Sequence, residues 1–242
     1  MAVVDGKAAT PVQRPQVELV GQRSAIRRLR EYFRKGLHDW VREFLEYKYL
    51  IALSLVLVIV ATYLDYYSGV YVSATKAADV PDLILDHLKP IDLNFLFVYG
   101  YMALIVTMFL YPLFFHIRML HVVVCQFSLL LMLRALFLIF THLQTPAGSV
   151  PVDFPWFFGK LYFENDMFFS GHTAIPFLGF YVFRRSPIRY AFLVGSVVMG
   201  ITALAMHLHY SIDVFSAFFI TYCSYQMGSV VIRQIDPAYQ DT

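Results

Sequence analysis

Residues 119–141 read MLHVVVCQFSLLLMLRALFLIFT, an apolar run that carries one arginine, Arg134. A helix that crosses a bilayer needs about 20 predominantly apolar residues, and this run supplies them. Five further runs of this kind are found, at roughly 49–68, 93–115, 167–183, 190–208 and 214–232. The pattern predicts an all-α membrane protein with six transmembrane helices.

The composition supports a membrane location. Of the 242 residues, 59% are hydrophobic and only 15% are charged, whereas an average soluble domain has about 25% charged residues. The bilayer is therefore the expected partner of most of the surface. The net charge of +2 is too small to indicate a nucleic acid partner.

The distribution of Lys and Arg predicts the orientation. Six spans place both termini on one side, and that side carries 15 of the 19 Lys and Arg residues; Lys76, Lys89 and Lys160 lie on the other, and Arg134 lies within a span. By the positive-inside rule both termini are cytoplasmic. The loops 69–92 and 142–169 and the connection 207–213 then face outward.

The chain divides into four expected parts. Residues 1–15 form a disordered tail, 16–48 a cytoplasmic helix, 49–232 the six-helix catalytic domain and 233–242 a cytoplasmic tail. Within 24–48, apolar residues recur at helical spacing with arginines between them, which predicts an amphipathic helix on the membrane surface. Packing of this helix against the cytoplasmic loops is the alternative.

Two polar segments carry the candidate chemistry, FSGHT at 169–173 and HLHYSIDV at 207–214. Both lie at the predicted outer ends of spans, so a helical hairpin can bring them together. Ser170 is a good N-cap, and Gly171 lets backbone N–H groups approach an anion closely. His172 follows in the first turn. This segment has the outline of a phosphate cradle.

His209 and Asp213 are four residues apart, so a helix places them on one face. The carboxylate can then accept the proton of one ring nitrogen and leave the other as a nucleophile, which makes a phosphohistidine possible. His172 would protonate the departing alkoxide and later deprotonate the acceptor hydroxyl. This chemistry requires no metal and no cofactor.

Each segment also has an ordinary interpretation. A Ser-Gly-His-Thr helix start can be a simple cap, and a His with an Asp at i+4 can be a local helix pair. Their placement at the same membrane face favours a shared site. Arg134 has two interpretations as well: a clamp for phosphoryl oxygens, or a buried ion pair with Asp65 or Asp166.

These segments resemble the sphingomyelin synthase family, a branch of the lipid phosphatase superfamily. Asp166 precedes Ser170 by four residues, as in the signature C-G-D-x-x-x-S-G-H-T, and residues 209–214 match H-Y-[ST]-x-D-V. Residues 80–87 are similar to the P-D motif that this family has in its first loop. Arg134 and Thr141 match the Arg and Thr of the family's second motif. The resemblance covers roughly residues 80–232.

The resemblance implies six spans, an exoplasmic active site and a catalytic triad of His172, His209 and Asp213. Candidate substrate-binding residues are Arg134, Asp166, Ser170, Gly171 and Tyr210. The chain departs from the family at Glu164-Asn165, where the signature has Cys-Gly, and at Leu208, where animal members commonly have an acidic residue linked to headgroup choice.

The sequence thus predicts an enzyme that moves a phospho-headgroup from a phospholipid donor to ceramide or a similar lipid alcohol. A hydrolase with the same His-His-Asp site, such as a lipid phosphatase or a phospholipase C-like enzyme, is the alternative. Generic superfamily phosphatases usually carry a Ser-Arg pair ahead of the second histidine, whereas Thr202-Ala203 stands near that place here, which favours the synthase branch. A transporter or channel is the third possibility, but the polar residues collect near one surface rather than at mid-membrane.

Overall fold

The computed structural model describes residues 16–155, 163, 165–237 and 239, with side chains from residue 36 onward. The predicted tail 1–15 lies outside the described residues, and so do residues 238 and 240–242 of the predicted tail 233–242. The chain forms two units, Met1–Glu46 and Tyr47–Thr242. Residues 16–48 are helical; the location of this stretch on the membrane surface stays a prediction.

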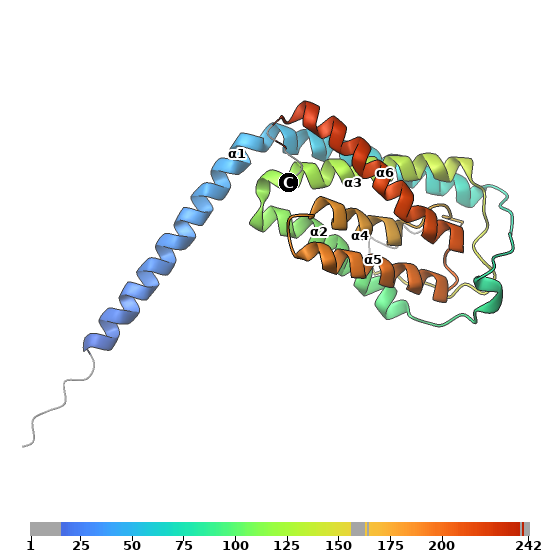
Figure 1. Cartoon of the computed structure of the whole chain (residues 1–242), viewed down its shortest axis with the longest axis horizontal. Coiled ribbons are helices and arrows are strands. Elements are labelled where there is room, and N and C mark those ends of the chain that lie inside the picture. Colours follow the sequence, from blue (N-terminus) through green and yellow to red (C-terminus); the bar gives the residue numbers. More distant parts are fainter. Residues whose placement is uncertain (1–15, 156–162, 164, 238, 240–242) are drawn as a thin grey trace, which may run out of the picture. The chain divides into compact units, whose positions relative to one another are not determined.

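The described residues form an all-helical fold, in which the one β-contact is an isolated bridge between Ala78 and Leu143. The second unit is a bundle of long helices (Figure 1). The helices are α1 (Gln16–Ala74), α2 (Tyr101–Phe115), α3 (Leu120–Phe140), α4 (Gly171–Val182), α5 (Ile188–Ala205) and α6 (Ser211–Ile235). Three short helical turns accompany them: η1 (Leu85–His87), η2 (Leu96–Gly100), which is a π-helix, and η3 (Ile117–Met119).

Five helical stretches among the described residues are long and apolar enough to cross a membrane. They are Gly36–Ala74, Leu96–Phe115, Ile117–Phe140, Ile188–Ala205 and Ser211–Ile235. The chain is therefore a multi-pass integral membrane protein. The expected span 167–183 contains only the 12 residues of α4, which rise about 18 Å, less than the hydrocarbon core of about 30 Å. The six-span count and the orientation stay predictions.

Helix α4 is short but lies inside the bundle, packed against α5 and α6 (Figure 1). Eight of its 12 residues are buried, so its length does not have to match the lipid. Gly179 allows α4 to pack closely against α5. A Cβ atom at Gly179 would lie 2.5 Å from the ring of the buried Phe192 on α5.

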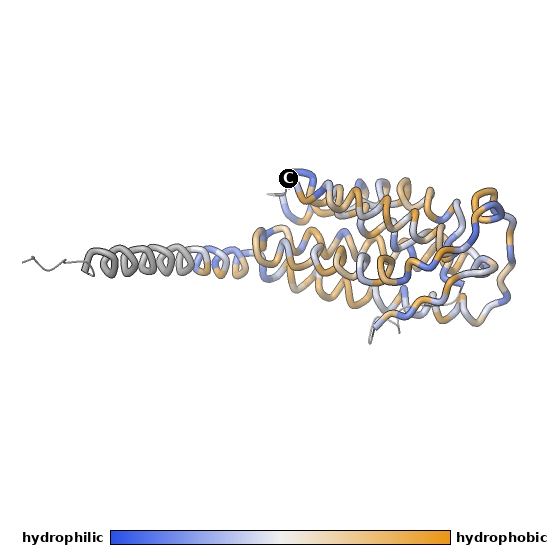
Figure 2. The backbone as a smooth tube through the Cα atoms, turned by 90° about the horizontal axis from the view of Figure 1, so that it is seen from below, coloured by the Kyte–Doolittle hydropathy of each residue, from blue (hydrophilic) through white to orange (hydrophobic). Residues whose placement is uncertain are grey.

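The loops 75–95 and 141–155 gather at one end of the bundle (Figure 1). This end is more polar than the helices, which are mostly hydrophobic along their length (Figure 2). Backbone hydrogen bonds join the loops to each other and to the end of α5. The N–H of Ala78 donates to the carbonyl of His142 at 3.0 Å, and the N–H of Val150 donates to the carbonyl of Met206 at 3.0 Å. The predicted catalytic residues lie at this end.

The close approach of α4 and α5 predicts that Gly179→Ala destabilises the bundle. The added methyl group must displace a ring that also stacks on Phe183, and overpacking of this kind costs about 1–3 kcal/mol. Gly36→Ala is the matched control, because a Cβ atom there meets nothing within 4 Å. We expect the melting temperature in detergent to fall for Gly179→Ala only. Equal melting temperatures for both variants would contradict this packing.

Candidate active site

The two histidine segments meet through their backbones. Ser170, the residue before α4, donates its N–H to the carbonyl of Asp213 in the first turn of α6 at 3.1 Å. The imidazole rings of His172 and His209 are consequently 6.0 Å apart, centroid to centroid. The structure thus brings together the residues that the sequence predicted to share a site.

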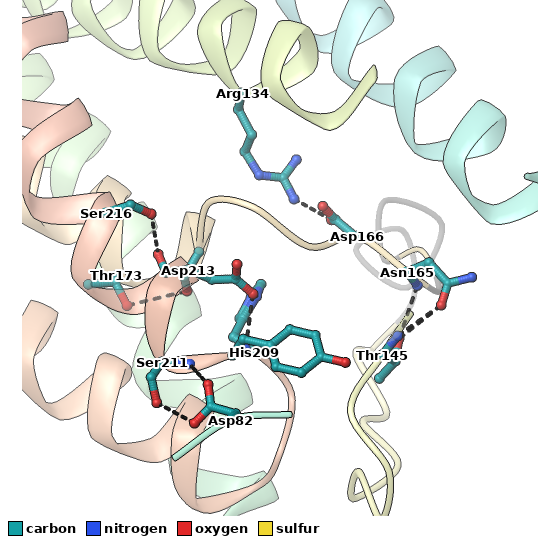
Figure 3. Close-up of polar contacts among 12 residues, drawn as sticks. Asp82, Arg134, Thr145, Asn165, Asp166, Thr173, His209, Ser211, Asp213 and Ser216 are labelled. Atoms are coloured by element: carbon teal, nitrogen blue, oxygen red, sulfur yellow. Dashed lines mark hydrogen bonds and ion pairs between the residues drawn. The ribbon is translucent and has the colours of Figure 1, made fainter. Parts of the chain in front are cut away.

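Asp213 holds His209 in place. Its carboxylate is fully buried, and Oδ2 lies 3.4 Å from Nδ1 of His209 (Figure 3). The same oxygen accepts the N–H of Tyr210 at 3.0 Å, which anchors it at the start of α6. At 3.4 Å the two groups are close enough for an ion pair, but Nδ1 makes no hydrogen bond among the described residues. If Nδ1 carries the proton, Nε2 is the atom with a free lone pair. Distances of this kind often shorten when substrate binds.

His172 lies against an aromatic wall. The rings of Phe97 and Tyr101 are each 4.3 Å from its imidazole, and Phe154 is 6.0 Å away. Its Nδ1 is buried and has no hydrogen-bond partner among the described residues. The wall restricts the position of the ring, and Nδ1 is available for a proton transfer rather than for a structural bond.

Gly171 lies at the point where α4 begins next to Arg134. A Cβ atom at this position would be 3.1 Å from Nε of Arg134, so a larger residue would crowd the guanidinium. This Nε is buried and lacks a hydrogen-bond partner in the described part of the chain. The start of α4 therefore combines the free backbone N–H groups of a helix N-terminus with a nearby cation, which suits a bound anion.

The terminal nitrogens of Arg134 are occupied. Nη1 donates to Oδ1 of Asp65 on α1 at 2.6 Å, and Nη2 donates to Oδ2 of Asp166 (Figure 3). The side chains of all three residues are at most one fifth exposed. Arg134 thus forms both of the ion pairs that the sequence offered as alternatives to a phosphate clamp. Only its Nε is directed at the site without such a partner.

The loop before α4 positions Asp166. Asn165 has a φ of +60°, a left-handed conformation that asparagine tolerates better than other residues with a side chain. Its side-chain oxygen accepts the N–H of Thr145 at 2.9 Å, and its own N–H donates to the hydroxyl of Thr145 at 3.0 Å. Asparagine can therefore replace the glycine that the family signature has here.

Asp82 supports the site from the loop 75–95, where the sequence showed only a weak motif match at residues 80–87. It accepts the hydroxyl and the N–H of Ser211, each at 2.7 Å, and so caps α6 (Figure 3). It also accepts two backbone N–H groups of its own loop. Burial opposes ionisation, but these hydrogen bonds outweigh it and lower the pKa of Asp82.

Tyr210 and His207 also have structural bonds. The hydroxyl of Tyr210 donates to Asp79 at 3.0 Å; burial and this bond raise its pKa to about 12, so the phenol stays neutral. The ring of His207 contacts the carbonyls of Ala147 and Leu88 at 3.2 and 3.0 Å and so connects two loops. Nothing in the sequence signalled this, because the partners are 60 and 119 residues away along the chain.

Residues 165–229 match the model of the PAP2 superfamily C-terminal family. The matched stretch contains the loop at Asp166, helices α4 and α5 and most of α6. The match supports the lipid phosphatase superfamily, whose members are phosphoryl-transfer enzymes, and therefore supports an enzyme. No curated protein matches the chain significantly. Among the described residues, no group of three His, Cys, Asp or Glu side chains is arranged to hold a metal ion.

The bonds of Asp82 predict a pH-dependent contribution to stability. Because its folded pKa is lower than its ordinary value near 3.8, the ionised group stabilises the fold above that value and loses this effect as the pH falls through the folded pKa. Asp82→Asn should cost about 1–3 kcal/mol at neutral pH. The difference in melting temperature from wild type should be largest above about pH 4 and should narrow as the pH falls further, through the lower pKa of the folded state.

Asp86→Asn, in an exposed residue of the same loop, is the matched control for this measurement. It should melt close to wild type at neutral pH. A difference between Asp82→Asn and wild type that stays constant over the whole pH range would show that the charge of Asp82 contributes nothing.

Proposed function

We propose that this protein transfers a phospho-headgroup from a glycerophospholipid to ceramide or a similar lipid alcohol through a phosphohistidine intermediate. The observation that carries the proposal is the pair of imidazoles 6.0 Å apart, with the buried Asp213 behind one of them. A phosphorus atom between the rings lies within reach of both. The match to the lipid phosphatase superfamily supports a phosphoryl-transfer reaction.

In the first half-reaction, Nε2 of His209 attacks phosphorus. The phosphorus–nitrogen bond forms as the bond to the diacylglycerol oxygen breaks, and a protonated His172 gives its proton to the departing oxygen. Asp213 stabilises the positive charge that develops on His209, because its carboxylate faces Nδ1. The products are diacylglycerol and a phosphorylated His209.

In the second half-reaction, the neutral His172 accepts the proton of the lipid alcohol. The alcohol oxygen then attacks phosphorus, the phosphorus–nitrogen bond breaks, and His209 returns to the neutral form with its Nδ1 proton on the Asp213 side. The two histidines end in their starting protonation states, so the cycle closes without a metal or a cofactor. Water in place of the alcohol would give hydrolysis.

The negative charge of the phosphate has two sources of stabilisation at the site. The first backbone N–H groups of α4 lack partners within the helix, and Gly171 leaves room for an oxygen beside them. Nε of Arg134 lies at the same place. In a site shielded from water, such fixed donors count for more than they would in solution. We propose that Ser170, Gly171 and Arg134 act in this way.

Hydrolysis is the second candidate function. It is favoured by the superfamily match, since members of that superfamily are mostly phosphatases. Transfer is favoured by the resemblance of residues 209–214 to the synthase signature and by Thr202-Ala203, which stands near where generic superfamily phosphatases have a Ser-Arg pair. The two functions share the first half-reaction and differ only in the acceptor of the second.

We also propose that the site faces the exoplasmic side. Fifteen of the 19 Lys and Arg residues would then be cytoplasmic if α4 counts as a crossing. Under this arrangement the loops 75–95 and 141–155, which border the site, lie outside the cytoplasm.

A transfer assay tests the proposed function. Purified protein in mixed micelles receives a phospholipid of defined headgroup, with and without ceramide, and mass spectrometry identifies the products. We expect a ceramide carrying the phospho-headgroup, together with diacylglycerol in equal amount. Diacylglycerol formed at the same rate without ceramide, and without a ceramide product, would identify the protein as a hydrolase instead.

The assigned roles predict which variant still forms the covalent intermediate. A nitrophenyl phosphoester has an activated leaving group that needs no proton donor, so His172→Ala should still become labelled on His209, while His209→Ala should not. Asp213→Asn should keep the fold and cut turnover by several orders of magnitude, roughly 10⁴-fold by analogy with other orienting carboxylates. Peptide mapping of the label provides the measurement. A label on His172 would reverse the two roles.

A further inference from the structure

A groove of about 660 Å³ runs along the outer surface between α2 and α5. Its lining is apolar except for Thr107 and Tyr190, and it contains no charged residue. It opens on the surface that meets the bilayer, where its rim residue Val194 is 62% exposed. A protein surface of this kind is in contact with lipid chains rather than with water.

Glycines and alanines create the groove. At Gly195, a Cβ atom would lie 2.7 Å from Leu104 of α2, and at Gly100 it would lie 3.2 Å from Met199 of α5. The two helices therefore touch at their glycines. The small side chains of Ala103 and Ala191 leave the space in front of this contact unfilled.

One helical turn separates the groove from the candidate active site. Leu96 and Gly100 line the groove, while Phe97 and Tyr101, on the same stretch of chain, stack on His172 at 4.3 Å. This turn is the π-helix η2. π-Helical turns are rare and are found frequently at functional sites, because the extra residue redirects the side chains around them.

We propose that the groove between α2 and α5 seats one hydrocarbon chain of the lipid substrate whose phosphate lies between His172 and His209. The proposal rests on the proposed function and adds to it where the substrate is held. The lining residues on this side extend from 96 to 107, over η2 and the first part of α2, about 16 Å at 1.5 Å per residue. One leaflet of the hydrocarbon core is about 15 Å thick, so the groove accommodates the extended chain of a membrane lipid.

The groove accounts for two needs of the reaction. A lipid must be held so that its phosphate is at the depth of the imidazoles, and a chain fixed beside η2 sets that depth. The energy of binding a chain far from the reacting atoms can also position the phosphate. A substrate without a chain would lose this contribution but could still react at the histidines.

Tryptophan substitutions that fill the groove test the proposal. Ala103→Trp and Ala191→Trp place an indole in the space of the chain from α2 and from α5. Ala52→Trp is the matched control, because Ala52 is an exposed residue of α1 outside the groove. The kcat/KM is measured for a long-chain phospholipid and for a nitrophenyl phosphoester that has no chain, and the ratio of the two values is compared.

We expect this ratio to fall about tenfold or more in each groove variant and to stay at the wild-type value in Ala52→Trp, since even single methylenes are discriminated to that extent in apolar pockets. An unchanged ratio in both groove variants would overturn the proposal. The ratio would also stay unchanged if the groove held a lipid that is not the substrate, and the proposal would be wrong in that case too.

A binding measurement separates failure of this proposal from failure of the proposed function. A phospholipid with a diazirine in the middle of one chain is photolysed with the wild-type protein, and the labelled peptides are mapped. Labels on α2 and α5 that disappear in Ala103→Trp but not in Ala52→Trp support the groove, even if no phospholipid is turned over. Equal labelling of every helix that faces the lipid would overturn the proposal.

Discussion

The guanidinium of Arg134 binds two carboxylates that come from distant parts of the chain, Asp65 of α1 and Asp166 of the loop before α4. All three charges are largely shielded from water, and a buried charge without a partner is expensive. Removing one member of such a network costs about 3–5 kcal/mol. The network therefore fixes the loop at Asp166 relative to α1 and α3, and with it the point at which α4 begins.

The position of α4 in turn determines the geometry of the site. His172 is in the first turn of this helix, and the N–H of Ser170 donates to the carbonyl of Asp213 on α6. The distance between the two imidazoles thus depends on a backbone contact between helix starts rather than on a contact of the rings. Asp213 has two roles, because one of its carboxylate oxygens accepts the N–H of Tyr210 at the start of α6 and also faces His209. Orientation of the proposed nucleophile and stability of α6 are consequently coupled.

The loops at this end complete the bundle through hydrogen bonds to the same helix starts. Asp82 caps α6 at Ser211, and His207 contacts the carbonyls of Leu88 and Ala147, one in each loop. Phe97, which packs against His172, belongs to η2, and Leu96 and Gly100 of the same turn line the groove on the lipid-facing surface. Substrate chain and catalytic imidazole would therefore contact one short π-helical segment from its two sides.

The sequence alone predicted the membrane class, because long apolar runs are required of any helix in a bilayer, and it predicted the catalytic candidates, because their spacing follows helical geometry. It left the function of Arg134 open between a clamp and an ion pair, since its partners are 69 and 32 residues away along the chain. The short length of α4 was also beyond prediction: residues 167–170 are as apolar as a span but are not helical. The ion network, the left-handed residues Asn165 and His207 and the groove all depend on contacts between segments that are distant in sequence, and only the tertiary structure decides those.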